Sequence, residues 1–144
     1  MIKDLLIKKL DVKSDERGWL AEILRKEDLQ GNNDFGQILV TVAKPGVIKG
    51  NHYHKRKQEW FCVISGKGKL LLKENSSGEY QEVVMGEENM VAVKIPQNVT
   101  HALQNIGDSM LYLLIYIDEP FDPQNPDTFS GKLNSIAPCS EKIG

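Results

Sequence analysis

Residues 46–66 read GVIKGNHYHKRKQEWFCVISG, and this stretch decides how the whole chain is interpreted. It contains two of the chain's three histidines, as the pair His52 and His54. Side chains two positions apart on a β-strand point to the same face, so this pair can converge on one ligand. The polar residues KRKQ that follow predict a turn. After that turn, Glu59 can begin the next strand and face back towards the histidines.

The third histidine, His101, lies within residues 96–105, PQNVTHALQN, just after a proline-containing turn. Imidazoles and a carboxylate that converge on one point form a site for a transition metal or for proton transfer. Three nitrogen donors and one oxygen donor suit zinc, iron, nickel or manganese, and the donor types alone do not choose among them. The sequence therefore predicts a site for metal or proton chemistry that is built from distant segments.

With their spacing, the two stretches are Gly46-x5-His52-x-His54-x4-Glu59-x6-Gly66 and Pro96-x-Asn98-x2-His101-x3-Asn105. These patterns closely resemble the two sequence signatures of the cupin superfamily. The second pattern departs at Asn98 and at Met90, where cupins usually have glycine, although asparagine tolerates the left-handed backbone that glycine would supply. The resemblance implies a small double-sheet β-barrel and a metal held by His52, His54, Glu59 and His101.

The rest of the chain consists of short β-like runs separated by turn-rich breaks. The expected strands are 36–43, 59–64, 69–73, 79–85, 90–95 and 110–117. Residues 24–29 alone have helical character. Many short strands with regular turns and almost no helix predict an all-β jelly-roll barrel. We expect a single cupin domain over residues 1–119, followed by an irregular tail over residues 120–144 that wraps the barrel or a partner subunit.

The composition excludes several classes of protein. The net charge of -2 and the mixed distribution of lysines and acids give no basic stripe for nucleic acid or membranes. No apolar run approaches the ~20 residues of a membrane helix, and the first residues lack the pattern of a secretory signal peptide. Cys62 and Cys139 lie in very different contexts, so we expect free thiols and a cytoplasmic location.

Segments that flank the cupin signatures narrow the resemblance. They are DERG at 15–18, DFGQ at 34–37, the run from KPG to GNHYH at 44–54, and FDPQNPDT at 121–128. Together they resemble cupin enzymes that remodel nucleotide-activated deoxysugars. The strongest likeness is to the C-terminal cupin domain of the bifunctional capsular-polysaccharide enzyme that makes the UDP-N-acetylfucosamine precursor.

That resemblance implies epimerisation at C3 of a UDP-4-keto-6-deoxy-N-acetylhexosamine. In that family a separate reductase domain then acts. The present chain has no G-x-G-x-x-G motif. A separate reductase is therefore an expected partner, and no organic cofactor is expected in this chain.

Epimerisation beside a ketone needs a stabilised enolate, a base on one face of the sugar and an acid on the other. A metal, or a cation such as Lys49, can stabilise the enolate oxygen, and Lys49 can instead contact the diphosphate. Our candidate catalytic residues are Lys49, His52 and Tyr116, and our candidate substrate contacts are Gln37, Tyr53 and Tyr112. Each has an ordinary alternative: a solvated lysine, barrel-packing tyrosines and a solvent-facing glutamine. For Trp19 and Trp60, we expect core packing rather than stacking on a base.

Other functions remain open from the sequence. Some cupin-fold sugar enzymes use such histidines as acids and bases without a metal. A 3,4-ketoisomerase acting on a dTDP-4-keto-6-deoxyhexose shares the barrel and a basic-Gly-x-His-x-His run. A metal-dependent dioxygenase and a non-catalytic ligand-binding cupin fit the same donors. Exposed strand edges and the long tail lead us to expect a homodimer.

Overall fold

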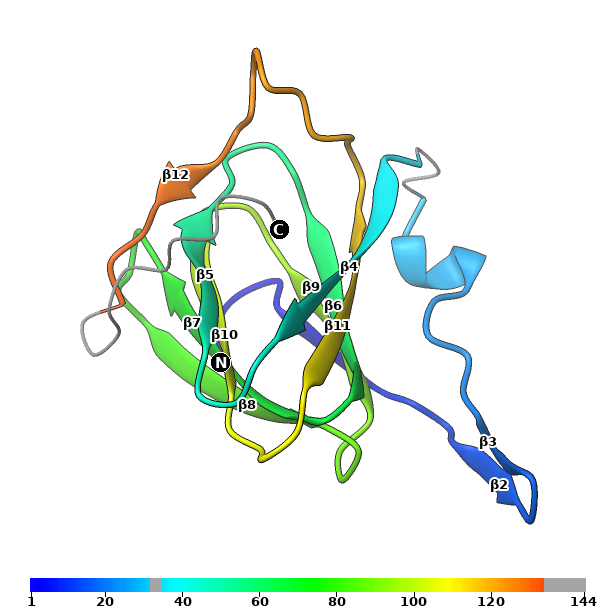
Figure 1. Cartoon of the computed structure of the whole chain (residues 1–144). Helices are drawn as coiled ribbons and strands as arrows, with labels where there is room; N and C mark the ends of the chain where they lie inside the picture. The colour runs from blue at the N-terminus through cyan, green and yellow to red at the C-terminus, as the bar shows by residue number, and fades with distance from the viewer. Residues whose placement is uncertain (32–34, 134–144) are drawn as a thin grey trace.

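The protein is described here by a computed structural model that covers residues 1–31 and 35–133. Two five-stranded antiparallel sheets form its body (Figure 1). The first sheet has, in spatial order, β1 (Leu6–Lys9), β9 (Val91–Ile95), β6 (Glu59–Ser65), β11 (Leu111–Ile117) and β4 (Gln37–Ala43). The second has β12 (Phe129–Ser130), β5 (Ile48–Tyr53), β10 (Val99–Asn105), β7 (Lys67–Glu74) and β8 (Tyr80–Gly86). This arrangement confirms the all-β cupin jelly roll.

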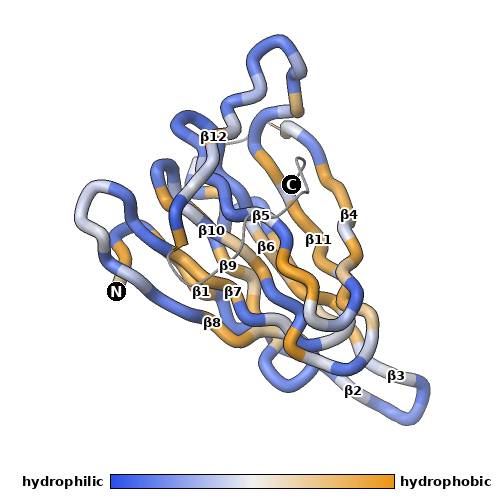
Figure 2. Tube along the Cα trace, turned by 60° about the vertical axis from the view of Figure 1, so that its left-hand side comes forward, coloured by the Kyte–Doolittle hydropathy of each residue, from blue (hydrophilic) through white to orange (hydrophobic). Residues whose placement is uncertain are grey.

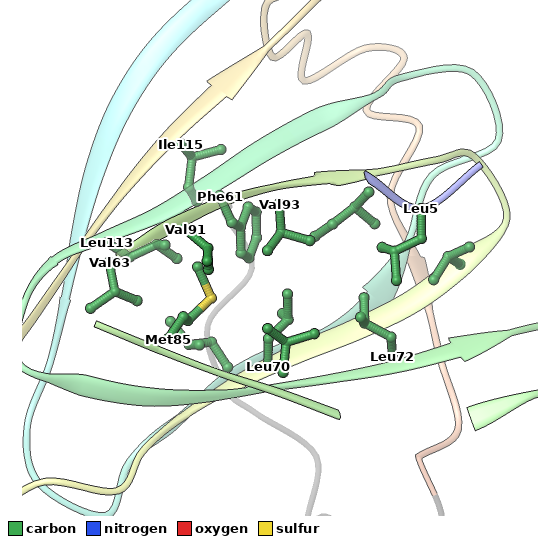
Figure 3. Close-up of a cluster of buried hydrophobic side chains, with 14 of the residues drawn as sticks. Leu5, Phe61, Val63, Leu70, Leu72, Met85, Val91, Val93, Leu113 and Ile115 are labelled. Atoms are coloured by element: carbon green, nitrogen blue, oxygen red, sulfur yellow. The ribbon is translucent and has the colours of Figure 1, made fainter. Parts of the chain in front are cut away.

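Alternate residues of the strands build the hydrophobic core between the two sheets. Figure 3 shows this cluster, in which Phe61 of β6, Leu70 of β7 and Ile115 of β11 lie close to one another. Each of the three is buried. Because side chains alternate along a strand, the same strands turn a second set of residues to the outer faces of the sheets.

The N-terminal region adds a small hairpin outside the barrel. Its strands are β2 (Lys13–Asp15) and β3 (Gly18–Leu20), and the hairpin extends away from the two sheets (Figure 1). Trp19 is 54% exposed there, so the expectation that it packs in the core is wrong. Trp60, by contrast, is 7% exposed and packs with Leu10 and Met90 on the outer face of the first sheet.

The expected helical segment at 24–29 is a short 3-10 helix, η1 (Lys26–Leu29). The described part of the chain contains no helix with the length and apolar character needed to span a membrane.

The described part of the C-terminal region is irregular apart from one short strand. Residues 121–133, which we call the C-terminal strap, include β12, and β12 pairs with β5. Leu133 is buried against Leu71 and Ala102 on the outer face of the second sheet. Hydrophobic residues lie along β4 and β11, whereas the loop that leads from β11 to β12 is mainly hydrophilic (Figure 2). Cys139 and the rest of residues 134–144 lie outside the described part of the chain.

Candidate metal centre

Four side chains from three strands and one loop converge between the two sheets. His52 is on β5, His54 follows the end of β5, Glu59 begins β6 and His101 is on β10. One donor atom from each lies within 4.8 Å of those of the others, and all four residues are buried. We call this group the donor cluster. The structure therefore brings together all four residues that the sequence nominated as ligands.

The polar loop between His54 and Glu59 explains why both face the interior. His52 and His54 are buried, and Tyr53 between them stacks on Phe129 of β12, on the opposite face of β5 (ring centroids 5.5 Å apart). The chain leaves the strand at His54 and re-enters one at Glu59, so the alternation restarts. The expected turn is confirmed.

A β-bulge in β5 places a further side chain on the interior face. His52 pairs with His101 and Lys49 pairs with Leu103, so three steps along β5 match two steps along β10. The bulge is at Gly50 and Asn51, both with positive φ, and a Cβ at Gly50 would lie 2.9 Å from the carbonyl oxygen of His101. The added residue lets Lys49 face the interior together with His52, despite their odd separation.

Lys49 connects the two sheets across the barrel. Its cross-strand partner Leu103 belongs to the central core, and its Nζ donates a hydrogen bond of 2.7 Å to Oγ1 of Thr41. Thr41 is on β4, opposite the core residue Leu113. The Lys49 ammonium group is thus held between the sheets, on the face of β5 that carries His52.

The hydrogen-bond pattern of the donor cluster fits a bound cation. Nδ1 of His54 donates to the carbonyl oxygen of Asp127 at 2.7 Å, and Nδ1 of His101 donates to that of Val99 at 2.9 Å. The Nε2 atoms of the three histidines and both carboxylate oxygens of Glu59 are buried, and none of them makes a hydrogen bond among the described residues. Nε2 of His54 and Nε2 of His101 face Oε1 of Glu59, the latter at 3.2 Å, but with the protons on Nδ1 these atoms are all acceptors. Such unpaired buried atoms cost roughly 1–3 kcal/mol each unless an ion or water satisfies them.

The electrostatics of His52 and Glu59 favour the forms that bind cations, whereas the surroundings of His54 favour its protonated form. Burial and, to a lesser extent, the neighbouring His101 lower the pKa of His52 to about 3, so His52 is neutral at physiological pH. Burial alone would raise the pKa of Glu59, but His101 and His54 more than offset this and hold that pKa below its usual value. Burial likewise lowers the pKa of His54, but the adjacent Glu59 carboxylate outweighs it and raises that pKa. A neutral imidazole beside an ionised carboxylate is a donor set suited to a divalent ion.

The other predicted site residues lie in different places. Gln37 is on the interior face of β4, opposite the core residue Ile117, and its Oε1 accepts a hydrogen bond from the backbone N–H of Phe121. Tyr53 stacks on the strap, as described above. The structure therefore brings Gln37, but not Tyr53, to the interior side that carries the donor cluster.

Tyr112 and Tyr116 lie on the outer face of β11, because they alternate with Leu113 and Ile115 of the core. Tyr116 lines an apolar cavity of about 440 Å³ together with Trp60, and Tyr112 is exposed. The structure does not bring either tyrosine to the donor cluster. Proton transfer by Tyr116 at the cluster is therefore not supported by this geometry.

Asp127 is a site residue that the sequence analysis did not single out. It is buried, and its two carboxylate oxygens accept hydrogen bonds from the backbone N–H groups of Lys55, Arg56 and Lys57, at 3.0, 2.9 and 3.0 Å. The only sequence signal was its place in the segment 121–128, which resembles the end of the nucleotide-sugar cupin domain.

A double-sheet barrel with three imidazoles and one carboxylate in its interior defines the class as a cupin-fold protein with a candidate metal centre. The family model described as "Polysaccharide biosynthesis C-terminal domain" matches residues 13–129, and the chain belongs to this family.

Three similar proteins place the family in context. The spore coat polysaccharide biosynthesis protein SpsL of Bacillus subtilis is 33% identical over 132 residues, which are 88% of this chain and 87% of SpsL. UDP-2-acetamido-2,6-beta-L-arabino-hexul-4-ose reductase of Pseudomonas aeruginosa is 32% identical over 81% of this chain and 30% of the reductase. The solved structure of the capsular polysaccharide assembling protein CapF of Staphylococcus aureus is 34% identical, with a TM-score of 0.67, over 86% of this chain and 34% of CapF. The chain thus spans about a third of the latter two proteins.

Solved structures of a dTDP-sugar isomerase and of dTDP-sugar epimerases share the fold, with TM-scores of 0.77–0.82 at 19–21% identity. The family model and SpsL place the chain among polysaccharide biosynthesis proteins. A further relative, Agl13 of Haloferax volcanii, is 29% identical over 88% of this chain and 85% of Agl13, and is named as a probable low-salt glycan biosynthesis epimerase.

Proposed function

We propose that this chain inverts C3 of a UDP-4-keto-6-deoxy-N-acetylhexosamine during the synthesis of capsular or other surface polysaccharide. The observation that carries the proposal is the donor cluster in the barrel interior, with Lys49 on the interior face of β5 that also carries His52. The Pseudomonas relative is named for a reaction on a UDP-linked 4-keto sugar of this kind. This supports a UDP-linked 4-keto sugar as the substrate.

We further propose that Nε2 of His52, His54 and His101 and the carboxylate of Glu59 hold a divalent transition metal. Zinc is our choice, and iron, nickel and manganese are compatible with the same donors. The unpaired, buried donor atoms support this assignment. Such an ion would supply a Lewis acid that stabilises negative charge at the C4 oxygen when the C3 proton leaves.

In this scheme Lys49 provides the second positive charge at the sugar. Histidines that coordinate a metal are poor bases, so His52 serves as a ligand, and it acts as a base only in the metal-free alternative. The Lys49 ammonium group lies on the interior face and can point at the ketone oxygen or the diphosphate. Gln37, on the interior face of β4, is our candidate contact for the sugar hydroxyls.

Incubation of the purified protein with UDP- and dTDP-linked 4-keto-6-deoxy sugars in D2O, followed by NMR, tests the function. We expect deuterium at C3 with inversion of that centre for the UDP-linked substrate. Migration of the ketone would identify a ketoisomerase instead, and oxygen uptake would identify a dioxygenase. Absence of exchange with every keto sugar would refute the sugar-enzyme proposal and favour a binding protein.

We also propose that the chain forms a homodimer. Trp19 and Leu20 of the protruding hairpin are 54% and 60% exposed, and β4 pairs only with β11 within the described residues. The outer face of β4 exposes Ile38 and Val40, at 57% and 56%. Exposed apolar side chains beside an open sheet edge are suited to a second copy. Light scattering should give twice the monomer mass, and a monomer would refute the proposal.

The cellular setting is the last part of this proposal. Cys62 is buried with a free thiol, which supports the cytoplasmic location expected from the sequence. We propose that a separate reductase consumes the epimerised keto sugar. A coupled assay with a nicotinamide-dependent 4-keto-sugar reductase should show cofactor oxidation only after this protein has acted.

A further inference from the structure

The C-terminal strap contacts a side chain of the donor cluster through Asp127. Its backbone has a positive φ of 49°, a conformation that is uncommon for a residue with a side chain. Three neighbouring contacts hold the strap in place there. β12 pairs with β5 at Tyr53 and His52, Gly131 N–H donates to the Asn51 carbonyl oxygen at 2.9 Å, and Lys57 Nζ donates to the Pro126 carbonyl oxygen at 3.0 Å.

The carboxylate and the backbone carbonyl group of Asp127 have different hydrogen-bond partners. Its carboxylate accepts hydrogen bonds from three consecutive backbone N–H groups, those of residues 55–57, and so fixes the loop that links His54 to Glu59. Its carbonyl oxygen accepts a hydrogen bond from Nδ1 of His54 at 2.7 Å. Because a carbonyl oxygen can only accept, Nδ1 must carry the proton, and the lone pair of the neutral ring is then on Nε2.

We propose that Asp127 is a positioning residue that sets the tautomer and the direction of His54. The carboxylate anchors Asp127 to the loop, and this anchoring places its carbonyl oxygen against the imidazole. Nε2 of His54 is thereby presented to the donor cluster, where it lies in close contact with Glu59. Partners of this kind orient ligand histidines, and their loss typically weakens metal binding by roughly 10–100-fold.

The hydrogen-bond partner that fixes the Nδ1 proton is local for His101 and distant for His54. Nδ1 of His101 donates to the carbonyl oxygen of Val99, two residues earlier on the same strand. His54 lies beyond the last residue of β5 and receives its partner from a residue 73 positions away. The strap therefore does for His54 what β10 does for His101.

The variant that tests this inference is Asp127→Asn. Asparagine tolerates a positive φ, so the backbone is preserved, but its amide nitrogen cannot accept a hydrogen bond from the loop. Asp122→Asn is the matched control, because Asp122 is exposed in the same strap and its carboxylate accepts a bond only from the nearby Gln124 N–H among the described residues. Circular dichroism establishes that both variants are folded.

Two measurements decide the outcome. Competition with a chelator should show that Zn²⁺ binds Asp127→Asn about 10–100-fold more weakly than Asp122→Asn. Nitrogen-15 NMR of the histidine rings, in metal-free protein at alkaline pH, should place the His54 proton on Nδ1 in the wild type and distribute it over both nitrogens in Asp127→Asn. Equal zinc affinity and equal tautomers in the two variants would overturn the proposal. So would a wild-type His54 that carries its proton on Nε2, and this result needs no variant.

The inference rests on the metal site of the proposed function, but the tautomer measurement requires neither metal nor substrate. An Nδ1 proton on His54 without C3 exchange would therefore remove the epimerase and leave the role of Asp127 intact. C3 exchange together with an Nε2 proton on His54 would support the epimerase and remove the role of Asp127.

Discussion

The two faces of the first sheet differ in chemistry, although adjacent residues of the same strands build them. On β6, Glu59 faces the donor cluster and Trp60 faces the apolar outer cavity. On β11, Ile115 packs in the core and Tyr116 lines that cavity. The interior collects unpaired donor atoms, whereas the outer face collects aromatic and aliphatic surface. Substitutions of interior residues should therefore change the reaction rate, whereas substitutions on the outer face should leave it nearly unchanged.

The largest expected effect is that of Glu59→Gln. The amide keeps the shape of the side chain but removes the only carboxylate of the donor cluster and its negative charge. We expect loss of bound metal and a fall in the C3 exchange rate of at least about 10³-fold, or ~4 kcal/mol of transition-state stabilisation. Elemental analysis and deuterium exchange measure the two quantities.

Glu88→Gln is the control for this change, because Glu88 is largely exposed and faces Lys67 at 3.5 Å on the surface. Exposed pairs of this kind contribute little to stability. If Glu59→Gln retained both metal and exchange, the donor cluster would not be the reaction centre.

The second prediction distinguishes the role of Lys49 in the reaction from the role of the four donor residues in metal binding. Lys49→Met keeps the length of the side chain and removes the ammonium group. We expect the exchange rate to fall about 10²-fold while the metal content stays constant, because Lys49 is not among the four converging donors. Lys67→Met, on the partly exposed start of β7, should leave both quantities unchanged. Full activity of Lys49→Met would reduce Lys49 to a strut between the two sheets.

The sequence predicted the parts of the site that follow strand periodicity. The shared face of His52 and His54 follows from the period of two, and the return of Glu59 follows from the polar break before it. Lys49 is different, because the bulge at Gly50 and Asn51 shifts its alternation, and a bulge adds a residue without any periodic signal.

Contacts between distant segments were not predictable. Asp127 contacts a histidine 73 residues away, and such a partner is established only when the strap pairs with β5. The same limit applies to Trp19. Its apolar side chain suggested core packing. The short hairpin that carries it lies outside the barrel, and the residue types of the hairpin did not predict that position. The tyrosines of β11 alternate with the core residues of that strand, but the sequence alone could not say which set faces the interior.

The smallest expected effect is that of Tyr116→Phe. Tyr116 is on the outer face of β11, so removal of its hydroxyl should leave metal content unchanged and alter the exchange rate by no more than about 2-fold, the size of an ordinary surface substitution. Tyr112 lies four residues earlier on the same outer face of β11, so Tyr112→Phe should also leave metal content and exchange rate nearly unchanged. A loss of exchange comparable to that of Lys49→Met would show that Tyr116 reaches the reacting sugar. Since its side chain points away from the donor cluster, the sugar would then have to bind on the outer face, and the division of chemistry between the two faces would fail.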